Sequence, residues 1–255
     1  MRSSFLIILF ILVLKPFPVF GENVLIQAKN ITLNKNSEIS IFENEVLIKT
    51  KDGDSIKSEF AEYDRKNGII KLKNNIIAND IQNNQIKAEK AEYNEKNKIF
   101  TTIGETKITT TEKYVINGKD IILSNFDNFI KSDNKTVITD QDNNRIFLDN
   151  FDYSKIKNIF KSTGNIKIID NKNNTYEFSQ IYIDTKSKEI LGTDSKAFLN
   201  DESFKINEKN KPRIFSNTVS INENKKSFDK SIFTICDYRE NDKCPPWTIQ
   251  ASKML

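Results

Sequence analysis

A repeat of about 30 residues runs through most of this 255-residue chain. Tyr63 and Tyr93 lie 30 residues apart, in the similar segments IKSEFAEYDRKNGII and IKAEKAEYNEKNKIF. Three sets of apolar residues follow this period: Leu33, Tyr63, Tyr93, Ile122, Tyr153 and Ile183; Ile39, Ile69, Ile99, Phe129 and Ile159; and Ile48, Ala78, Ile108, Ile138, Ile168 and Phe198. In such a repeat each unit is one supersecondary element that buries its apolar face against its neighbours.

Each unit has the pattern of two β-strands. The segment IKAEKAEY alternates small or apolar residues with charged ones, which is the period of a half-buried strand. Polar stretches such as 64–68 and 94–98 separate these segments and indicate hairpin turns. Proline is absent from Glu22 to Lys211, and no segment after the first 21 residues has helical periodicity. The pattern therefore predicts an all-β chain.

One position in each unit is suited to a sharp change of backbone direction. It is occupied by Asn44, Asn74, Gly104, Asn134, Gly164 and Asp194. Glycine, asparagine and aspartate are the residues that best tolerate a left-handed backbone. The sequence therefore predicts a corner at this position of every unit.

Stacking the units gives two facing antiparallel sheets, because a strand with one apolar face needs a second apolar face to cover it. The ten residues expected on the inner faces are Leu33, Ile48, Tyr63, Ala78, Tyr93, Ile108, Ile138, Tyr153, Ile168 and Phe198. They could form a packed core or the wall of an open trough. Periodicity alone favours the packed core.

The composition argues against several classes of site. The chain has no histidine, which excludes Ser-His-Asp and Cys-His catalysis and histidine-rich metal sites. It has no glycine-rich phosphate loop, and Cys236 and Cys244 lack further metal ligands. A formal net charge of +4 is too small for a nucleic-acid footprint. We therefore expect no catalytic residues, cofactor, metal or nucleic-acid partner.

The first residues have the pattern of a signal peptide. Arg2 precedes an apolar run from Phe5 to Leu14, which is too short to span a bilayer comfortably. We expect residues 1–21 to be cleaved on export, with a retained anchor as the alternative. Export leads to an oxidising compartment, where Cys236 and Cys244 are first interpreted as disulfide cysteines.

The composition changes near residue 230, after which both cysteines, the only tryptophan and a Pro-Pro pair occur. Residues 24–230 resemble the OstA-like domains of lipopolysaccharide transport, whose G-N-V signature is matched at Gly164-Asn165-Ile166, Asn74-Asn75-Ile76, Asn44-Glu45-Val46 and Gly104-Glu105-Thr106. The tail FTICDYRENDKCPPWTIQASKM resembles the segment that joins the periplasmic domain of the LPS-assembly (LptD) family to its outer-membrane barrel. Thr234, Cys236, Trp247, Ala251 and Lys253 hold the family's places there.

This resemblance implies a signal peptide (1–21), a β-jellyroll domain with a hydrophobic inner groove (22–230) and a connector to a barrel (231–255). In that family the groove receives lipopolysaccharide from a periplasmic bridge of similar jellyrolls and passes it to the barrel at the periplasmic face of the outer membrane. The implied partners are lipopolysaccharide, a bridge protein added at a sheet edge, and a lipoprotein plug acting through the barrel. The resemblance favours the trough over the packed core, with the ten inner-face residues as its lipid-contacting wall.

The chain departs from the family in two respects. It has no barrel segment, and Glu22 to Ile235 contains no cysteine that could tie the domain to one. Cys236 and Cys244 could pair with each other or with a barrel. Two other functions remain open: a free periplasmic bridge protein of the same fold, and a repetitive surface β-solenoid acting as an adhesin.

Overall fold

The computed structural model describes residues 24–34, 38–200, 212–222, 225–235 and 247–255. Within these ranges it contains strands and no helix, and all strand pairs are antiparallel. The predicted all-β, repetitive antiparallel jellyroll is confirmed. The predicted signal peptide, residues 1–21, lies outside the described residues.

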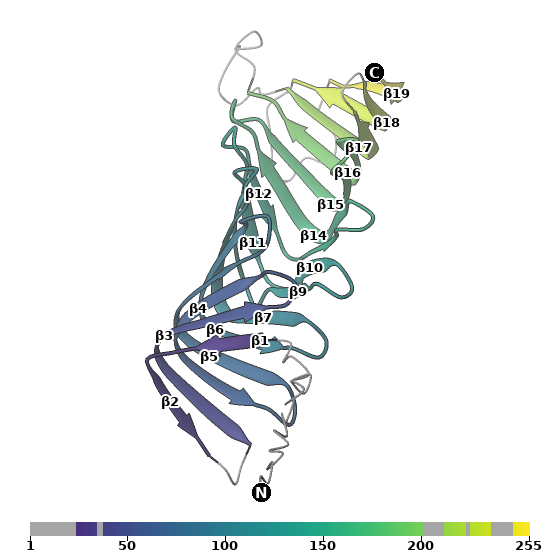
Figure 1. The fold of residues 1–255 in the computed structure, drawn as a ribbon. Helices are drawn as coiled ribbons and strands as arrows, with labels where there is room; N and C mark the ends of the chain where they lie inside the picture. The colour runs from purple at the N-terminus through teal and green to yellow at the C-terminus, as the bar shows by residue number, and fades with distance from the viewer. Residues whose placement is uncertain (1–23, 35–37, 201–211, 223–224, 236–246) are drawn as a thin grey trace, which may run out of the picture.

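The strands follow one another along an elongated, twisted body, from β2 at one end to β19 at the other (Figure 1). They are β1 (Val24–Gln27), β2 (Asn30–Leu33), β3 (Ile39–Thr50), β4 (Ser55–Asp64), β5 (Ile69–Asn79), β6 (Gln85–Asn94), β7 (Ile99–Thr109), β8 (Val115–Lys119), β9 (Ile122–Ser124), β10 (Phe129–Ser132), β11 (Thr136–Thr139), β12 (Arg145–Leu148), β13 (Phe151–Ser154), β14 (Ile159–Ile169), β15 (Thr175–Asp184), β16 (Glu189–Phe198), β17 (Arg213–Ile221), β18 (Lys226–Thr234) and β19 (Ile249–Met254).

The 30-residue period is visible in the strand boundaries. Successive units begin at residues 39, 69, 99, 129, 159 and 189, the first residues of β3, β5, β7, β10, β14 and β16. Strand β18 crosses the composition change near residue 230, and β19 pairs with it. The described part of the tail therefore extends the same sheet.

Each long strand bends in the middle, so that its two halves belong to two walls. In β5 the buried residues Leu72 and Ile76 are four positions apart instead of two, and Asn74 and Asn75 between them have φ of 65° and 52°. The register of β5 against β6 shifts by one residue at the same place. Residues from both halves of the first strands belong to one buried cluster, so the walls pack face to face at this end of the molecule.

The predicted corners are confirmed in five of the six units. Asn44, Asn74, Gly104, Gly164 and Asp194 have φ between 51° and 98°. Asn134 does not have a positive φ, and the prediction for this residue is wrong. At Asn134 the chain leaves the strand pattern between β10 and β11, and the Asn134 amide donates a hydrogen bond to Ser132 Oγ at 3.1 Å. A break between two short strands replaces the left-handed corner there.

Gly104 offers a test of the corner, because a Cβ atom added there would meet no atom within 4 Å. Gly104→Val should lower the free energy of unfolding by about 1–3 kcal/mol through backbone strain at φ of 84°. Gly104→Asn should cost less, because asparagine tolerates a left-handed backbone. Urea unfolding of both variants measures the difference. Equal costs for valine and asparagine would contradict the role assigned to the corner.

The hairpin turns form two edges, one for each wall. The turns at 64–68, 94–98, 124–128, 154–158 and 184–188 make one edge, called here the basic edge. The turns at 50–54, 80–84, 110–114, 140–144 and 170–174 make the other, called the acidic edge. The names reflect their charges, since the first set has eight Lys and Arg against four Asp and Glu, and the second has three against seven.

Candidate functional site

The apolar face enclosed by the two walls, called here the inner face, is the site predicted from the sequence. Strand pairing aligns its side chains in two continuous rows, because directly paired residues point to the same side of a sheet. The row near the basic edge contains Leu33, Ser40, Tyr63, Ile70, Tyr93, Phe100, Leu123, Ile130, Tyr153, Phe160, Ile183, Ile190 and Ile221. The row near the acidic edge contains Ile26, Ile48, Ile56, Ala78, Ile86, Ile108, Ile116, Ile138, Ile146, Ile168, Tyr176, Ala197, Ile214, Phe233 and Ile249.

The inner face is closed at the amino-terminal end. Ile48, Ile70, Leu72 and Ile76 are almost completely buried. They pack in one cluster with aromatic residues such as Phe42 of strand β3. In this half of the molecule the inner face is a packed core.

The inner face becomes accessible from β9 onward. In the row near the basic edge, Leu123, Ile130, Tyr153, Ile183, Ile190 and Ile221 are partly exposed. In the row near the acidic edge, partly exposed residues occur in both halves, at Ile26, Ile86, Ile116, Ile146, Ile168, Tyr176, Ile214 and Phe233, and Ile138 and Ala197 are buried. The row near the basic edge therefore changes, except at the buried Phe160, from a packed core into a partly exposed apolar surface that lies against the second core cluster.

Nine of the ten predicted inner-face residues point to the inner face. Ile48, Tyr63, Ala78, Tyr93, Ile108 and Ile138 are buried there, and Tyr153 and Ile168 are partly exposed. Leu33 is also on this side, because it pairs with Ser40, which pairs with Tyr63. Its side chain is nevertheless 63% exposed, because β2 pairs with β3 and no described strand lies beyond it. Contact of these residues with lipid stays a prediction.

The inward orientation predicted for Phe198 is wrong. Tyr176, which pairs with Ile168, pairs with Ala197, so Ala197 takes the place in the row. The corner of β16 has a step of three residues from Gly192 to Ser195, where β3, β5, β7 and β14 have a step of four. A strand shorter by one residue turns every later side chain to the other face. For a similar reason Leu123, not Ile122, continues the row of Tyr93, since Phe100 pairs with Leu123.

Two sets of inner-face residues were not included in the sequence-based prediction. Ile56, Ile86, Ile116, Ile146 and Tyr176 belong to the row near the acidic edge, and Ile70, Phe100, Ile130, Phe160 and Ile190 to the row near the basic edge. Both sets recur every 30 residues. The same period that revealed the other rows could therefore have revealed them.

Polar contacts join the two edges near the closed end. Lys98 Nζ lies 2.7 Å from Asp52 Oδ2, and Asn125 Nδ2 donates a hydrogen bond of 2.7 Å to Asp54 Oδ2. Burial raises the pKa of Asp54, and the nearby carboxylates of Asp80 and Asp52 raise it further. The turn at 50–54 thus contacts the turns at 94–98 and 124–128 of the opposite wall. These contacts keep the closed half of the inner face covered.

Two inner-face tyrosines resist ionisation. Burial raises the pKa of Tyr93 to about 12, with added repulsion from Asp54, Asp52 and Glu95. Burial also raises the pKa of Tyr176 to about 12, and its hydroxyl donates a hydrogen bond to Asp170 Oδ2 at 3.2 Å. Their phenol groups remain protonated in the folded protein at pH values where an unfolded chain loses the proton.

These shifts predict a loss of stability in alkali. A tyrosine of the unfolded chain ionises near pH 10, so the contribution of these two tyrosines to stability is constant below pH 10 and is lost between pH 10 and 12. Each tyrosine should contribute about 1–2 kcal/mol to this fall, after allowance for partial solvation. Urea unfolding at pH 8 and pH 11 should show a smaller fall for Tyr93→Phe/Tyr176→Phe than for the wild-type protein. Equal falls would contradict the shifted tyrosine pKa values.

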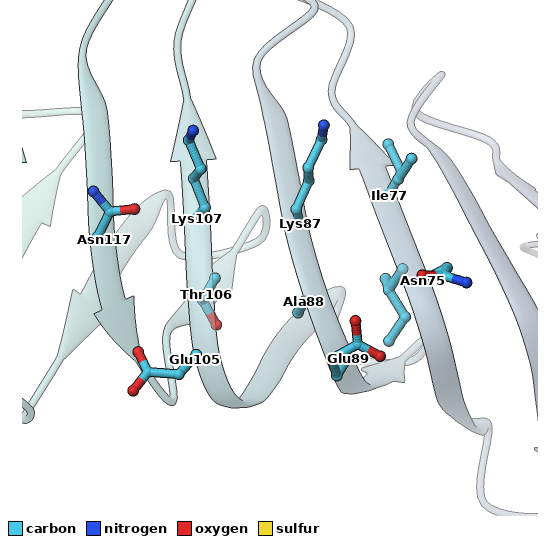
Figure 2. A pocket seen from close by; sticks show the side chains of 10 residues that line it. Asn75, Ile77, Lys87, Ala88, Glu89, Glu105, Thr106, Lys107 and Asn117 are labelled. Atoms are coloured by element: carbon cyan, nitrogen blue, oxygen red, sulfur yellow. The ribbon is translucent and has the colours of Figure 1, made fainter.

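A second site lies on the opposite, outer face. A pocket of about 430 Å³ spans strands β5 to β8 and is lined by Asn75, Ile77, Lys87, Glu89, Lys107 and Asn117, among others. Figure 2 shows Lys87 and Lys107 side by side on neighbouring strands, with Glu89 and Glu105 lying further along them. The two lysines and two glutamates balance in charge. The pocket is therefore suited to a polar surface contact and shows no arrangement of groups for catalysis.

The described residues contain no group of three or more His, Cys, Asp or Glu side chains placed to hold a metal ion. In the same part of the chain, no helix is long and apolar enough to cross a membrane. Cys236 and Cys244, the predicted disulfide pair, lie outside the described residues. Their pairing stays a prediction.

Comparison with known proteins gives no assignment. No protein-family model matches the chain, and no curated protein matches it. Among solved structures, it is similar to a crystal structure of LptH, the LptA-homologous periplasmic component of the conserved lipopolysaccharide transport device of Pseudomonas aeruginosa. The match has 10% sequence identity and a TM-score of 0.19, and it covers 67% of this chain and 81% of that chain. A TM-score this low supports no conclusion about fold or function.

Proposed function

We propose that this chain is a lipid-carrying domain of lipopolysaccharide transport, which holds acyl chains against the open half of its inner face. The observation that carries the proposal is the change along the row near the basic edge, from buried at Tyr63 and Ile70 to partly exposed at Ile183 and Ile190. A protein that needed only a core would gain stability by covering these side chains. An apolar surface left open along a row of strands is suited to an extended apolar ligand.

The proposed mechanism is transfer without chemistry. An acyl chain has a high free energy in water. Its passage through an aqueous compartment costs less free energy if each segment contacts apolar side chains instead of water. The two rows provide such contacts continuously from strand to strand, with Ile214 and Phe233 at the carboxyl-terminal end. The chain would receive lipopolysaccharide from a bridge protein and pass it to a translocon barrel at the periplasmic face of the outer membrane. A lipoprotein plug would act through that barrel.

A free periplasmic bridge protein is the second candidate. It is favoured by the open edges at both ends of the sheet, since β2 and β19 each pair with one strand among the described residues. Unpaired strand edges can add a strand of a partner. Both candidates use the inner face in the same way, and they differ in what receives the cargo.

Lipopolysaccharide binding by the purified exported chain tests the proposal. The double variant Ile183→Asn/Ile190→Asn places polar groups on the open inner face. The control, the double variant Tyr182→Asn/Leu191→Asn, places them at adjacent outer-face positions. Binding should weaken at least about tenfold in the inner-face variant and remain unchanged in the outer-face control. Circular dichroism and thermal unfolding establish that both variants are folded. Equal binding by two folded variants would overturn the proposal.

A further inference from the structure

The basic edge is a continuous ladder of turns. The Glu95 amide donates to the Gly68 carbonyl at 2.9 Å, and the Asn125 amide to the Lys98 carbonyl at 3.1 Å. The Lys155 amide donates to the Asn128 carbonyl, and the Thr185 amide to the Asn158 carbonyl, both at 2.8 Å. Each turn is thus fixed to the next. Two strands separate successive turns, so neighbouring tips are about 10 Å apart.

The middle residue of each turn is exposed, and two of the five are large and apolar. In chain order these residues are Lys66, Lys96, Phe126, Ile156 and Lys186. Phe126 is 73% exposed and Ile156 is 71% exposed, in adjacent turns at the centre of the ladder. Most hairpin tips are polar, so two apolar tips side by side require an explanation.

Hydrogen bonds hold these two tips in place. Ser124 Oγ accepts from the Asp127 amide at 3.0 Å, and Ser154 Oγ accepts from the Lys157 amide at 3.3 Å. The Asn128 side chain also donates to the Phe126 carbonyl at 3.3 Å. Because the turns are constrained in this way, they cannot readily fold their apolar side chains back onto the protein.

The charges around the tips are mixed but positive in sum: Asp127 follows Phe126, and Asp52 of the acidic edge pairs with Lys98. The five turns of the basic edge have a formal net charge of +4, and the five turns of the acidic edge have −4. Two of the four acids of the basic edge accept hydrogen bonds within their own turns, Asp64 from Asn67 and Asp184 from the amides of residues 186 and 187, and they keep their negative charge. Ile156 is flanked directly by Lys155 and Lys157, and the turn of Phe126 lies between two turns that contain two lysines each.

We propose that the basic edge docks on the surface of an anionic lipid bilayer, with Phe126 and Ile156 inserted among the headgroups and the flanking lysines on the lipid phosphates. Insertion of apolar side chains at the boundary between headgroups and acyl chains is favourable, and lysine places its charge in the headgroup layer. Basic residues near an anionic surface are attracted to it over about a Debye length. The acidic edge has the opposite net charge and is repelled by the same surface, although its turn at 50–54 contacts the basic edge at Lys98 and Asn125.

This docking is independent of the cargo on the inner face. Phe126 and Ile156 lie at turn tips and outside the two inner-face rows. Loss of lipopolysaccharide binding with membrane docking intact would contradict the proposed function alone. The reverse result would contradict the docking proposal alone.

Vesicle co-sedimentation of the purified exported chain tests the proposal. The probes are vesicles of phosphatidylcholine with and without phosphatidylglycerol, at low and high salt. We expect binding to the vesicles with phosphatidylglycerol, weakened by salt, and an affinity about 10- to 100-fold lower for Phe126→Ser/Ile156→Ser. Lys157→Glu/Lys186→Glu should weaken it by about tenfold or more. Ile81→Ser is the matched control, because Ile81 is a 69% exposed turn residue on the acidic edge.

Several results would overturn the proposal. They are failure of the wild-type chain to bind, equal binding to vesicles without phosphatidylglycerol, or an unchanged affinity of Phe126→Ser/Ile156→Ser. The same double variant is also examined by analytical ultracentrifugation without lipid. A wild-type dimer that becomes monomeric in the double variant would show that a second copy of the chain covers the tips instead of a bilayer.

Discussion

Ile70→Ala is expected to lower the free energy of unfolding by about 2–5 kcal/mol, the largest effect of any single substitution considered for this protein. Ile70 has no exposed surface and lies between Tyr63 and Tyr93 in the row near the basic edge. Its truncation removes apolar contacts and leaves a cavity where the two walls pack face to face. Urea unfolding followed by circular dichroism measures the change.

The control is Ile103→Ala. Ile103 lies in strand β7 beside the corner and is 51% exposed, so its truncation should change the unfolding free energy by no more than about 0.5 kcal/mol. A similar cost for both variants would mean that the amino-terminal half of the inner face is not a packed core.

Gly192→Ala is expected to destabilise the other half by about 1–3 kcal/mol through overpacking. A Cβ atom at Gly192 would lie 2.6 Å from Cδ1 of Phe178 and 3.1 Å from Cγ1 of Val219. Phe178 is buried and belongs to the second core cluster, so its ring must move to admit the methyl group. The backbone of Gly192 does not have a positive φ, so the cost arises from packing.

A double-mutant cycle checks this explanation. Phe178→Leu alone should destabilise the protein, but Gly192→Ala should cost less in the Phe178→Leu background, because the smaller side chain leaves room for the methyl group. Thermal or urea unfolding of the four proteins gives the interaction energy. Additive costs, or a neutral Gly192→Ala, would contradict the close contact between Gly192 and Phe178.

The repeat period was sufficient to predict the fold. Tyr63 and Tyr93 are 30 positions apart, as are Ala78 and Ile108, because each unit adds one pair of strands in the same register, so their common orientation follows from the sequence. The left-handed corner was predictable at Gly104 and Gly164 from the chemistry of glycine. It failed at Asn134, because asparagine permits a left-handed backbone but does not require one.

The period does not determine the register where a unit changes length. Phe198 continues the 30-residue spacing of Ile168, but the shorter corner of β16 places Ala197 on the inner face. Aspartate at position 194 keeps a positive φ in that corner, so the residue type alone did not reveal the missing position. Register depends on how two strands pair, which the spacing within one strand does not contain.

The sequence also did not predict which part of the inner face is exposed. Ile70 and Ile190 occupy equivalent positions of their units, yet Ile70 is buried and Ile190 is partly exposed. Ile70 is covered within the first core cluster, and contacts between distant turns, such as Lys98 with Asp52 and Asn125 with Asp54, join the two edges near that end. These pairs are 46 and 71 residues apart and follow no repeat, since the twist of the sheet brings them together.

Site-specific photo-crosslinking in lipopolysaccharide-producing cells tests the central claim most directly. A photoreactive phenylalanine analogue is placed at Ile190, on the open inner face, or at Leu191, its exposed neighbour on the outer face. Both positions carry aliphatic residues on the same strand, so they differ chiefly in the face to which they point. The account predicts a lipopolysaccharide adduct at position 190 and none at position 191. Equal labelling at the two positions, or an adduct at position 191 alone, would contradict it.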